Sequence, residues 1–209
     1  MRIDQQREQL CWEGLDPSWS TVDRDWHGQS VAVPATFALA MDPTHLWFVA
    51  AREKRASISP DAVPCQFAEA LWRYDVAELF IKDAHSDRYL EFNLAPNGAW
   101  WSAEFTSPRV RAYNEDIPIV GVKTYAKISG DGCWQAAASI PLSFLESDFS
   151  FGQGSRINVT FIVDSPEQKF LSVTALRGAK PDFHQPHCFN MVELNGRYDS
   201  WLAKWANTR

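Results

Sequence analysis

From residue 31 to residue 194 the chain is a succession of short apolar runs separated by turn-forming residues. The runs lie at 37–41, 45–51, 77–81, 89–94, 123–129, 133–140, 157–163, 170–175 and 189–194. The triplet Gly130-Asp131-Gly132, between two of these runs, is a strong signal for a hairpin turn. Many short strands at near-regular spacing pack as two antiparallel sheets, because each strand has an apolar face to bury. The sequence therefore predicts an all-β protein, a single antiparallel β-sandwich of the immunoglobulin or jelly-roll type.

We expect three parts within this one domain of 209 residues. Residues 31–194 form the sandwich core. Residues 1–30 form an irregular, tryptophan-rich lead-in, because glycine and proline interrupt any regular pattern there. Residues 195–209 form a short C-terminal helix, whose apolar face contains Trp201 and Trp205.

The charge and the apolar pattern exclude several classes of protein. A net charge of −6 argues against binding to nucleic acid or to an anionic membrane, since both need an excess of Lys and Arg. The best apolar stretch, residues 31–41, is interrupted by Pro34 and is far shorter than the ~20 residues of a membrane span. The charged N-terminus lacks the apolar run of a signal peptide, and the four cysteines form no C-x-x-C pair. We therefore expect a cytoplasmic protein with reduced thiols.

The most informative segment spans residues 71–101 and reads as a hairpin. Strand alternation separates its two faces. One face is apolar and is expected in the core: Ala77, Leu79, Ile81, Leu90, Phe92 and Leu94. The other face carries the remaining side chains of the two strands: Glu78, Phe80, Lys82, Tyr89, Glu91 and Asn93.

A turn at residues 84–87 places Glu78 opposite Asn93 and Phe80 opposite Glu91, which keeps core residues facing core residues. Aromatic rings cover the apolar face of a pyranose, and carboxylate and amide groups bind adjacent hydroxyls. The ten tryptophans also exceed what one core of this size needs, which suggests a stacking surface. The second face therefore suits a sugar; the alternative is an ordinary solvated face.

Two motifs in this hairpin resemble the family 9 carbohydrate-binding module, which belongs to the wider DOMON-like group of β-sandwiches. They are W-x-x-D-x-x-E-L-F-I at 72–81 and Y-x-E-F-N at 89–93. Segments at 46–51, 134–145 and 177–194 agree with that family in order and spacing, so the resemblance covers most of residues 31–194.

The resemblance implies a slot on the concave sheet face in which two aromatic side chains sandwich a sugar ring. Trp72 has the position of one wall, and Phe183 that of the other, where the family usually has Trp. Three further residues have the positions of polar contacts, and Lys180 lies just before the second wall. The implied ligand-binding residues are Trp72, Glu78, Glu91, Asn93, Lys180 and Phe183.

Three functions remain open. The first is a non-catalytic module that binds a small saccharide or polyol. The second is an interaction or structural β-sandwich that has lost sugar binding, in which the tryptophan-rich termini cover the old cleft or form a homodimer surface. The third is a glycoside hydrolase that uses Glu78 and Glu91, although no other catalytic motif accompanies them.

Metal binding has weak signals. Related modules often hold structural calcium, and hard oxygen ligands are available at Asp16, Asp23, Asp25 and Asp164, but no dense D-x-D spacing locates a site. His184 and His187, next to Cys188, form a second possible metal pair, although Pro186 breaks regular geometry between them. We expect no other cofactor.

Overall fold

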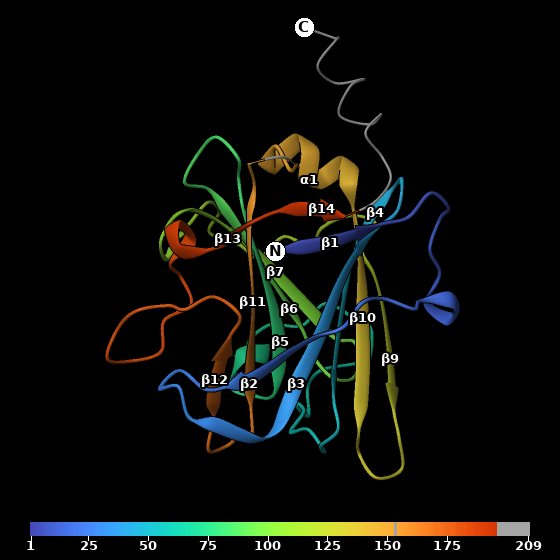
Figure 1. The fold of residues 1–209 in the computed structure, drawn as a ribbon, viewed down its shortest axis with the longest axis vertical. Coiled ribbons are helices and arrows are strands. Elements are labelled where there is room, and N and C mark those ends of the chain that lie inside the picture. The colour runs from blue at the N-terminus through green and yellow to red at the C-terminus, as the bar shows by residue number, and fades with distance from the viewer. Residues whose placement is uncertain (153, 196–209) are drawn as a thin grey trace, which may run out of the picture.

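The computed structural model describes residues 1–152 and 154–195, which form two seven-stranded sheets packed face to face (Figure 1). This confirms the predicted all-β sandwich. Sheet A contains β1 (Arg2–Gln5), β2 (Ser20–Arg24), β3 (Ser30–Met41), β4 (His45–Arg52), β9 (Lys123–Ile128), β10 (Trp134–Pro141) and β14 (Glu193–Asn195). Sheet B contains β5 (Val76–Lys82), β6 (Tyr89–Leu94), β7 (Trp100–Ser107), β8 (Val110–Arg111), β11 (Arg156–Val163), β12 (Lys169–Ser172) and β13 (Asn190–Met191).

Hairpins between consecutive strands build most of both sheets. Sheet A has the order β14-β1-β3-β4-β10-β9, with β2 also paired to β3. Sheet B has the order β12-β11-β5-β6-β7-β8, with β13 also paired to β11. All pairings are antiparallel except those of β1, which runs parallel to β3 and to β14.

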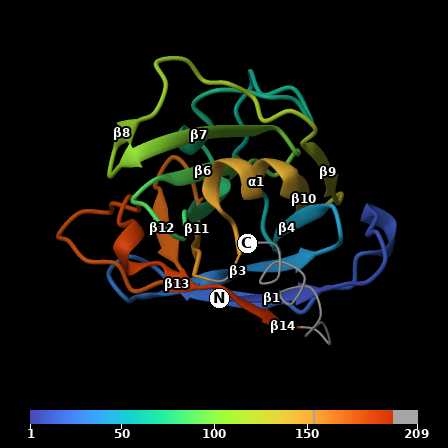
Figure 2. The ribbon, with the colours of Figure 1, turned by 90° about the horizontal axis from the view of Figure 1, so that it is seen from above.

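The main core lies between the sheets, and strand alternation explains it. The apolar face predicted for the hairpin of β5 and β6 points into this core, and all six of its side chains are fully buried. Helix α1 (Leu142–Phe149) closes one end of the sandwich, between the two sheets (Figure 2). Its buried residues Leu142, Leu145 and Phe149 lie on one helical face.

We expected an irregular lead-in at residues 1–30. The structure corrects this, because this segment contains β1 and β2. Ile3 and Val22 from these strands are buried in the main core. Both strands are short and mostly polar, so only their pairing with β3 and β14 makes them strands. Trp12 stacks on Tyr125 with ring centroids 5.8 Å apart, so this tryptophan packs within the molecule.

The predicted strands also differ from the observed ones in two places. The strand predicted at 189–194 is two strands, because the chain crosses from sheet B to sheet A at the buried residue Val192. Strand β7 and helix α1 are absent from the predicted runs. The predicted C-terminal helix begins at residue 195, and all but that residue lies outside the described residues.

A second apolar layer covers the outer face of sheet B. It joins side chains of this face to those of three connecting segments, 53–75, 95–99 and 173–189. Its buried members are Ala62, Leu71, Val76, Phe80, Tyr89, Ala95, Ala99, Trp101, Phe105, Ile162, Phe183 and Phe189. The sheet face that carries the predicted polar site is therefore covered by protein.

The four cysteines are all free thiols. Within the described residues, no helix is both long enough and apolar enough to cross a membrane.

Candidate functional site

The hairpin of β5 and β6 has the register predicted from its alternation. Glu78 lies opposite Asn93, and Phe80 lies opposite Glu91. The turn is closed by a hydrogen bond of 3.0 Å from the backbone N–H of Asp83 to the carbonyl of Arg88. This register brings Glu78, Glu91 and Asn93 together on the outer face of sheet B.

These three polar residues form a buried hydrogen-bonded group. Glu78, Glu91 and Asn93 are 2%, 6% and 0% exposed. The amide Nδ2 of Asn93 donates to Oε1 of Glu91 at 3.1 Å, and the hydroxyl of Thr160, on β11, donates to Oε2 of Glu78 at 2.7 Å. The amide oxygen Oδ1 of Asn93 is buried and has no hydrogen-bond partner. An unpaired buried acceptor is unfavourable by itself, so this oxygen is a point at which a ligand hydroxyl could bind.

Burial changes the protonation of both carboxyl groups. Burial, and then the neighbouring charge of Glu91, raises the pKa of Glu78 to about 8, although the hydrogen bond from Thr160 opposes the rise. Burial also raises the pKa of Glu91 to about 7, against the hydrogen bond from Asn93 and the positive charges of Arg111 and Arg109. At neutral pH the pair therefore keeps a proton, so it can both donate and accept hydrogen bonds.

His184 joins this group from the segment that closes over the sheet, residues 177–189, which we call the closing segment. Its Nδ1 lies 2.8 Å from the hydroxyl of Tyr89, and its Nε2 lies 3.8 Å from Oε2 of Glu91. Burial, and then the charge of Arg109, lowers the pKa of His184 to about 4, so the ring is neutral at pH 7. His187 is exposed, so the structure does not present the two histidines as a pair.

Sequence reasoning missed Thr160 and His184 as members of this site. Neither lies in the hairpin. The sequence offers His184 only as half of a possible metal pair with His187, and no motif marks Thr160. Only the pairing of β11 with β5 and the path of the closing segment bring them to the two glutamates.

The two predicted aromatic walls differ in exposure. Phe183 is 7% exposed and packs against Trp26 and Phe80, with ring centroids 6.2 and 6.4 Å away. The indole of Trp26 also donates to the carbonyl of Gly178 at 3.0 Å, so a tryptophan of the lead-in holds the closing segment down. Phe183 is thus part of the cover over the polar group.

Trp72 lies at the surface, 49% exposed, in a short 3₁₀-helix at Leu71–Arg73. The guanidinium of Arg73 lies 5.3 Å from the centre of its ring. Lys180 is exposed. In the part of the chain that the structure describes, no hydrogen bond, ion pair or ring contact joins the side chain of Trp72 or Lys180 to Glu78, Glu91 or Asn93.

Two of the aspartates that we considered for calcium already have protein partners. Asp25 accepts hydrogen bonds of 2.9 Å from the backbone N–H groups of His27 and Gln29. Although burial opposes it, hydrogen bonds from Arg52 and Lys54 hold the pKa of Asp164 at about 2. Across residues 1–152 and 154–195, no group of three or more His, Cys, Asp and Glu side chains is arranged to hold a metal ion.

Comparison with known proteins gives one sequence relative and several structural ones. No family model matches the chain. UPF0462 protein C4orf33 homolog of Mus musculus is 24% identical over 144 residues, which are 66% of this chain and 70% of the mouse protein.

The solved structures are similar over nearly the whole chain. A Bacteroides uniformis protein proposed to bind carbohydrate has a TM-score of 0.71 and 16% identity, covering 93% of this chain and 98% of that one. A family 9 carbohydrate-binding module from Caldicellulosiruptor kristjanssonii, in complex with cellotriose, has a TM-score of 0.64 and 15% identity, covering 95% and 96%. A glucose complex of a family 9 module from the same organism has a TM-score of 0.62 and 16% identity, covering 95% and 98%. The chain therefore has the β-sandwich fold seen in carbohydrate-binding modules of family 9.

Proposed function

We propose that the protein is a non-catalytic carbohydrate-binding protein that holds a small saccharide or polyol on the outer face of sheet B. The observation that carries this proposal is the unpaired amide oxygen of Asn93, which is buried beside Glu91. Structural neighbours of the same fold are complexes with glucose and cellotriose, which supports a sugar as the ligand. The resemblance to family 9 modules and their DOMON-like group agrees with this proposal.

The residues divide the recognition between stacking and hydrogen bonding. Trp72 offers an exposed ring for the apolar face of a pyranose. Asn93 accepts a hydrogen bond from a hydroxyl, and the two glutamates bind neighbouring hydroxyls as donor or acceptor according to their protonation. Because the polar group is covered, the closing segment must shift to admit the ligand, which places Phe183 and Lys180 at the edge of the opened slot.

Calorimetric titration with glucose and cellotriose tests this proposal. The key variant is Trp72→Ala, and the matched control is Trp19→Ala, since Trp19 is also exposed, at 43%. We expect saturable heat from the unmodified protein and from the control, and no saturable heat from Trp72→Ala with an unchanged circular dichroism spectrum. Equal binding by Trp72→Ala, or no heat from the unmodified protein, contradicts the proposal.

One observation favours a second candidate, a glycoside hydrolase. Glu78 and Glu91 are two buried carboxyl groups whose pKa values are raised to different values, as acid and base groups often are in active sites. Chromogenic glycosides test this candidate with the unmodified protein and with Glu78→Gln and Glu91→Gln. Turnover that both variants lose supports the hydrolase, and no turnover by the unmodified protein removes it.

A further inference from the structure

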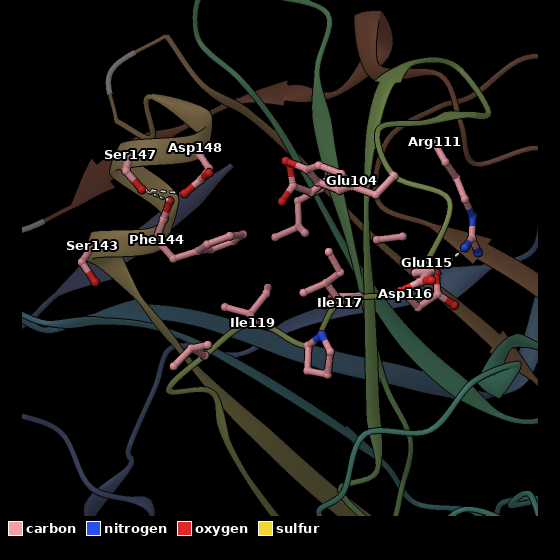
Figure 3. Close-up of a pocket in the computed structure, with 16 residues that line it drawn as sticks. Glu104, Arg111, Glu115, Asp116, Ile117, Ile119, Ser143, Phe144, Ser147 and Asp148 are labelled. Carbon is pink, nitrogen blue, oxygen red and sulfur yellow. Dashed lines mark hydrogen bonds and ion pairs between the residues drawn. The ribbon is translucent and has the colours of Figure 1, made fainter.

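A cavity of about 700 Å³ lies at the edge of the sandwich, between β7, helix α1 and the segment 111–120 (Figure 3). Its volume is in the range of small-molecule sites, about 300–1,000 Å³. Glu104 and Ser102 on β7 line the cavity. They are the cross-strand partners of Leu90 and Phe92 on β6, which point into the main core, and paired residues share a face of the sheet. The side chains of Ser102 and Glu104 therefore lie on the inner face of sheet B, whereas Glu91 and Asn93 lie on its outer face. This wall of the cavity is distinct from the proposed saccharide site, although Arg111 and Asp116 on the far wall are close enough to Glu91 to influence its pKa.

The centre of the cavity is apolar and its sides are acidic. Ile117, Ile119 and Phe144 lie in the middle (Figure 3). Glu104 and Asp148 lie on the side towards α1, and Glu115 and Asp116 lie on the other side. An apolar floor between carboxylates suits a ligand that has an aliphatic part and a positive charge.

The carboxylates on the α1 side have only part of their charge neutralised. Oε2 of Glu104 binds the guanidinium of Arg88 at 2.7 Å, and Asp148 accepts a hydrogen bond of 2.5 Å from the uncharged hydroxyl of Ser147. Burial raises the pKa of Glu104, and the carboxylate of Asp148 adds to the rise while Arg88 opposes it. Two acidic groups therefore face one cation here, which leaves an excess of negative charge.

The opposite side has a similar excess. Asp116 is occupied, because it accepts a hydrogen bond of 2.8 Å from the indole of Trp101 and pairs with Arg111. Glu115 is exposed and makes no hydrogen bond or ion pair within the described residues.

An independent observation points to a ligand. Ser102 lines the cavity and is 1% exposed, and its buried hydroxyl has no hydrogen-bond partner. Buried hydroxyls are almost always paired, because leaving one unpaired is unfavourable. A group that enters the cavity and donates a hydrogen bond would satisfy this oxygen.

We propose that this cavity binds an organic cation with a primary ammonium group on an aliphatic chain. The chain packs against Ile117, Ile119 and Phe144, and the ammonium group lies beside Glu104 and Asp148 and donates to Ser102. An ammonium group has three donors that point in different directions and can reach three separate acceptors, whereas a planar guanidinium is best matched to a single carboxylate.

Calorimetric titration of the full chain with hexylamine tests the proposal, with hexanol and hexanoate as uncharged and anionic probes of the same length. We expect saturable binding of hexylamine, at least about tenfold weaker binding of hexanol, and no binding of hexanoate. Equal binding of hexanol and hexylamine, or no binding of hexylamine, overturns the proposal.

Variants locate the binding. Glu104→Gln and Asp148→Asn should each weaken hexylamine binding about tenfold. Glu13→Gln is the matched control, because it removes the same charge from an exposed residue outside the cavity and should change nothing. Ser102→Ala should weaken binding severalfold without loss of folding, since the hydroxyl it removes has no partner. Unchanged affinity in all three cavity variants overturns the proposal.

The natural cation is either a free amine or a lysine side chain of a polypeptide, and one more probe separates them. Nα-acetyl-lysine amide presents the side chain with its backbone. Binding as tight as that of hexylamine supports a polypeptide ligand, and binding of hexylamine alone supports a free amine. Trp72→Ala should leave both affinities unchanged, so a failure of this proposal is distinguishable from a failure of the saccharide proposal.

Discussion

At the scale of single residues, Glu78 and Glu91 set the electrostatics of the outer face of sheet B. Alternation along the two strands predicts that these side chains share a face with Asn93, and the structure confirms it. Their burial was not predictable, because the segments that cover them come from distant parts of the chain. Burial is also what raises both pKa values, so the chemistry of the site depends on tertiary packing that a single hairpin does not contain.

The raised pKa values predict a loss of stability as the pH rises. A glutamate in the unfolded chain loses its proton near pH 4.5, whereas Glu78 in the folded protein loses it near pH 8. Between these values the folded state binds more protons, so the free energy of unfolding falls with rising pH, by at most about 1.4 kcal/mol per pH unit for each such group. His184, with its pKa lowered from 6.5 to about 4, has the opposite effect between pH 4 and 6.5. The fall should therefore be clearest between pH 6.5 and 8.

Urea unfolding at several pH values from 6.5 to 8 measures this fall. Glu78→Gln should make this fall shallower, because glutamine does not titrate and only the contribution of Glu91 remains. The exposed control Glu13→Gln should leave the fall unchanged. A flat profile in the unmodified protein, or the same slope in Glu78→Gln, would show that the carboxyl group of Glu78 is not kept protonated by burial.

Replacing the two aromatic wall residues, Phe183 and Trp72, should lower the free energy of unfolding by different amounts. Phe183→Ala removes a buried ring from the second apolar layer and should lower the free energy of unfolding by about 3–5 kcal/mol. Trp72→Ala removes a half-exposed ring and should lower it by less than about 1.5 kcal/mol. Thermal and urea unfolding of the two variants check this difference, and similar losses would mean that Trp72 is structural.

At the scale of elements, local sequence predicts hairpins better than isolated strands. The hairpins of β3 with β4, β5 with β6 and β9 with β10 follow from apolar runs on both sides of a turn signal. Helix α1 has only eight residues, and so short a helix is stable only through the burial of Leu142, Leu145 and Phe149. Strand β1 likewise depends on its partners, β3 and β14, which lie far along the chain.

The turn between β3 and β4 gives a prediction at this scale. The carboxylate of Asp42 is buried and accepts five hydrogen bonds. The donors are the backbone N–H groups of Leu10, Thr44 and His45, the hydroxyl of Thr44 and the indole of Trp47. Asp42→Ala leaves several of these buried donors unpaired and should lower the free energy of unfolding by about 3 kcal/mol. Asp131→Ala, at the exposed turn between β9 and β10, is the control and should have a much smaller effect. Urea unfolding compares the two variants, and equal losses would contradict this view of the β3–β4 turn.

At the scale of the whole molecule, the arrangement of covering segments distinguishes this protein from a simple sandwich. The inner faces of both sheets form the main core, and the outer face of sheet B is covered by a second apolar layer. The closing segment is tied to this layer by Phe183 and to the lead-in by Trp26. The resemblance to family 9 modules predicts the fold, but it does not predict that a tryptophan from residues 1–30 holds the cover in place.

The most direct test of the central proposal is to locate a bound saccharide by NMR. Backbone and tryptophan indole signals of the ¹⁵N-labelled protein would be followed during titration with cellotriose. We expect saturable shifts at the Trp72 indole, at the amides of Glu78, Glu91 and Asn93, and along residues 177–189, with little change along helix α1. An unchanged spectrum, or shifts confined to other parts of the molecule, would contradict the assignment of the saccharide site to the outer face of sheet B.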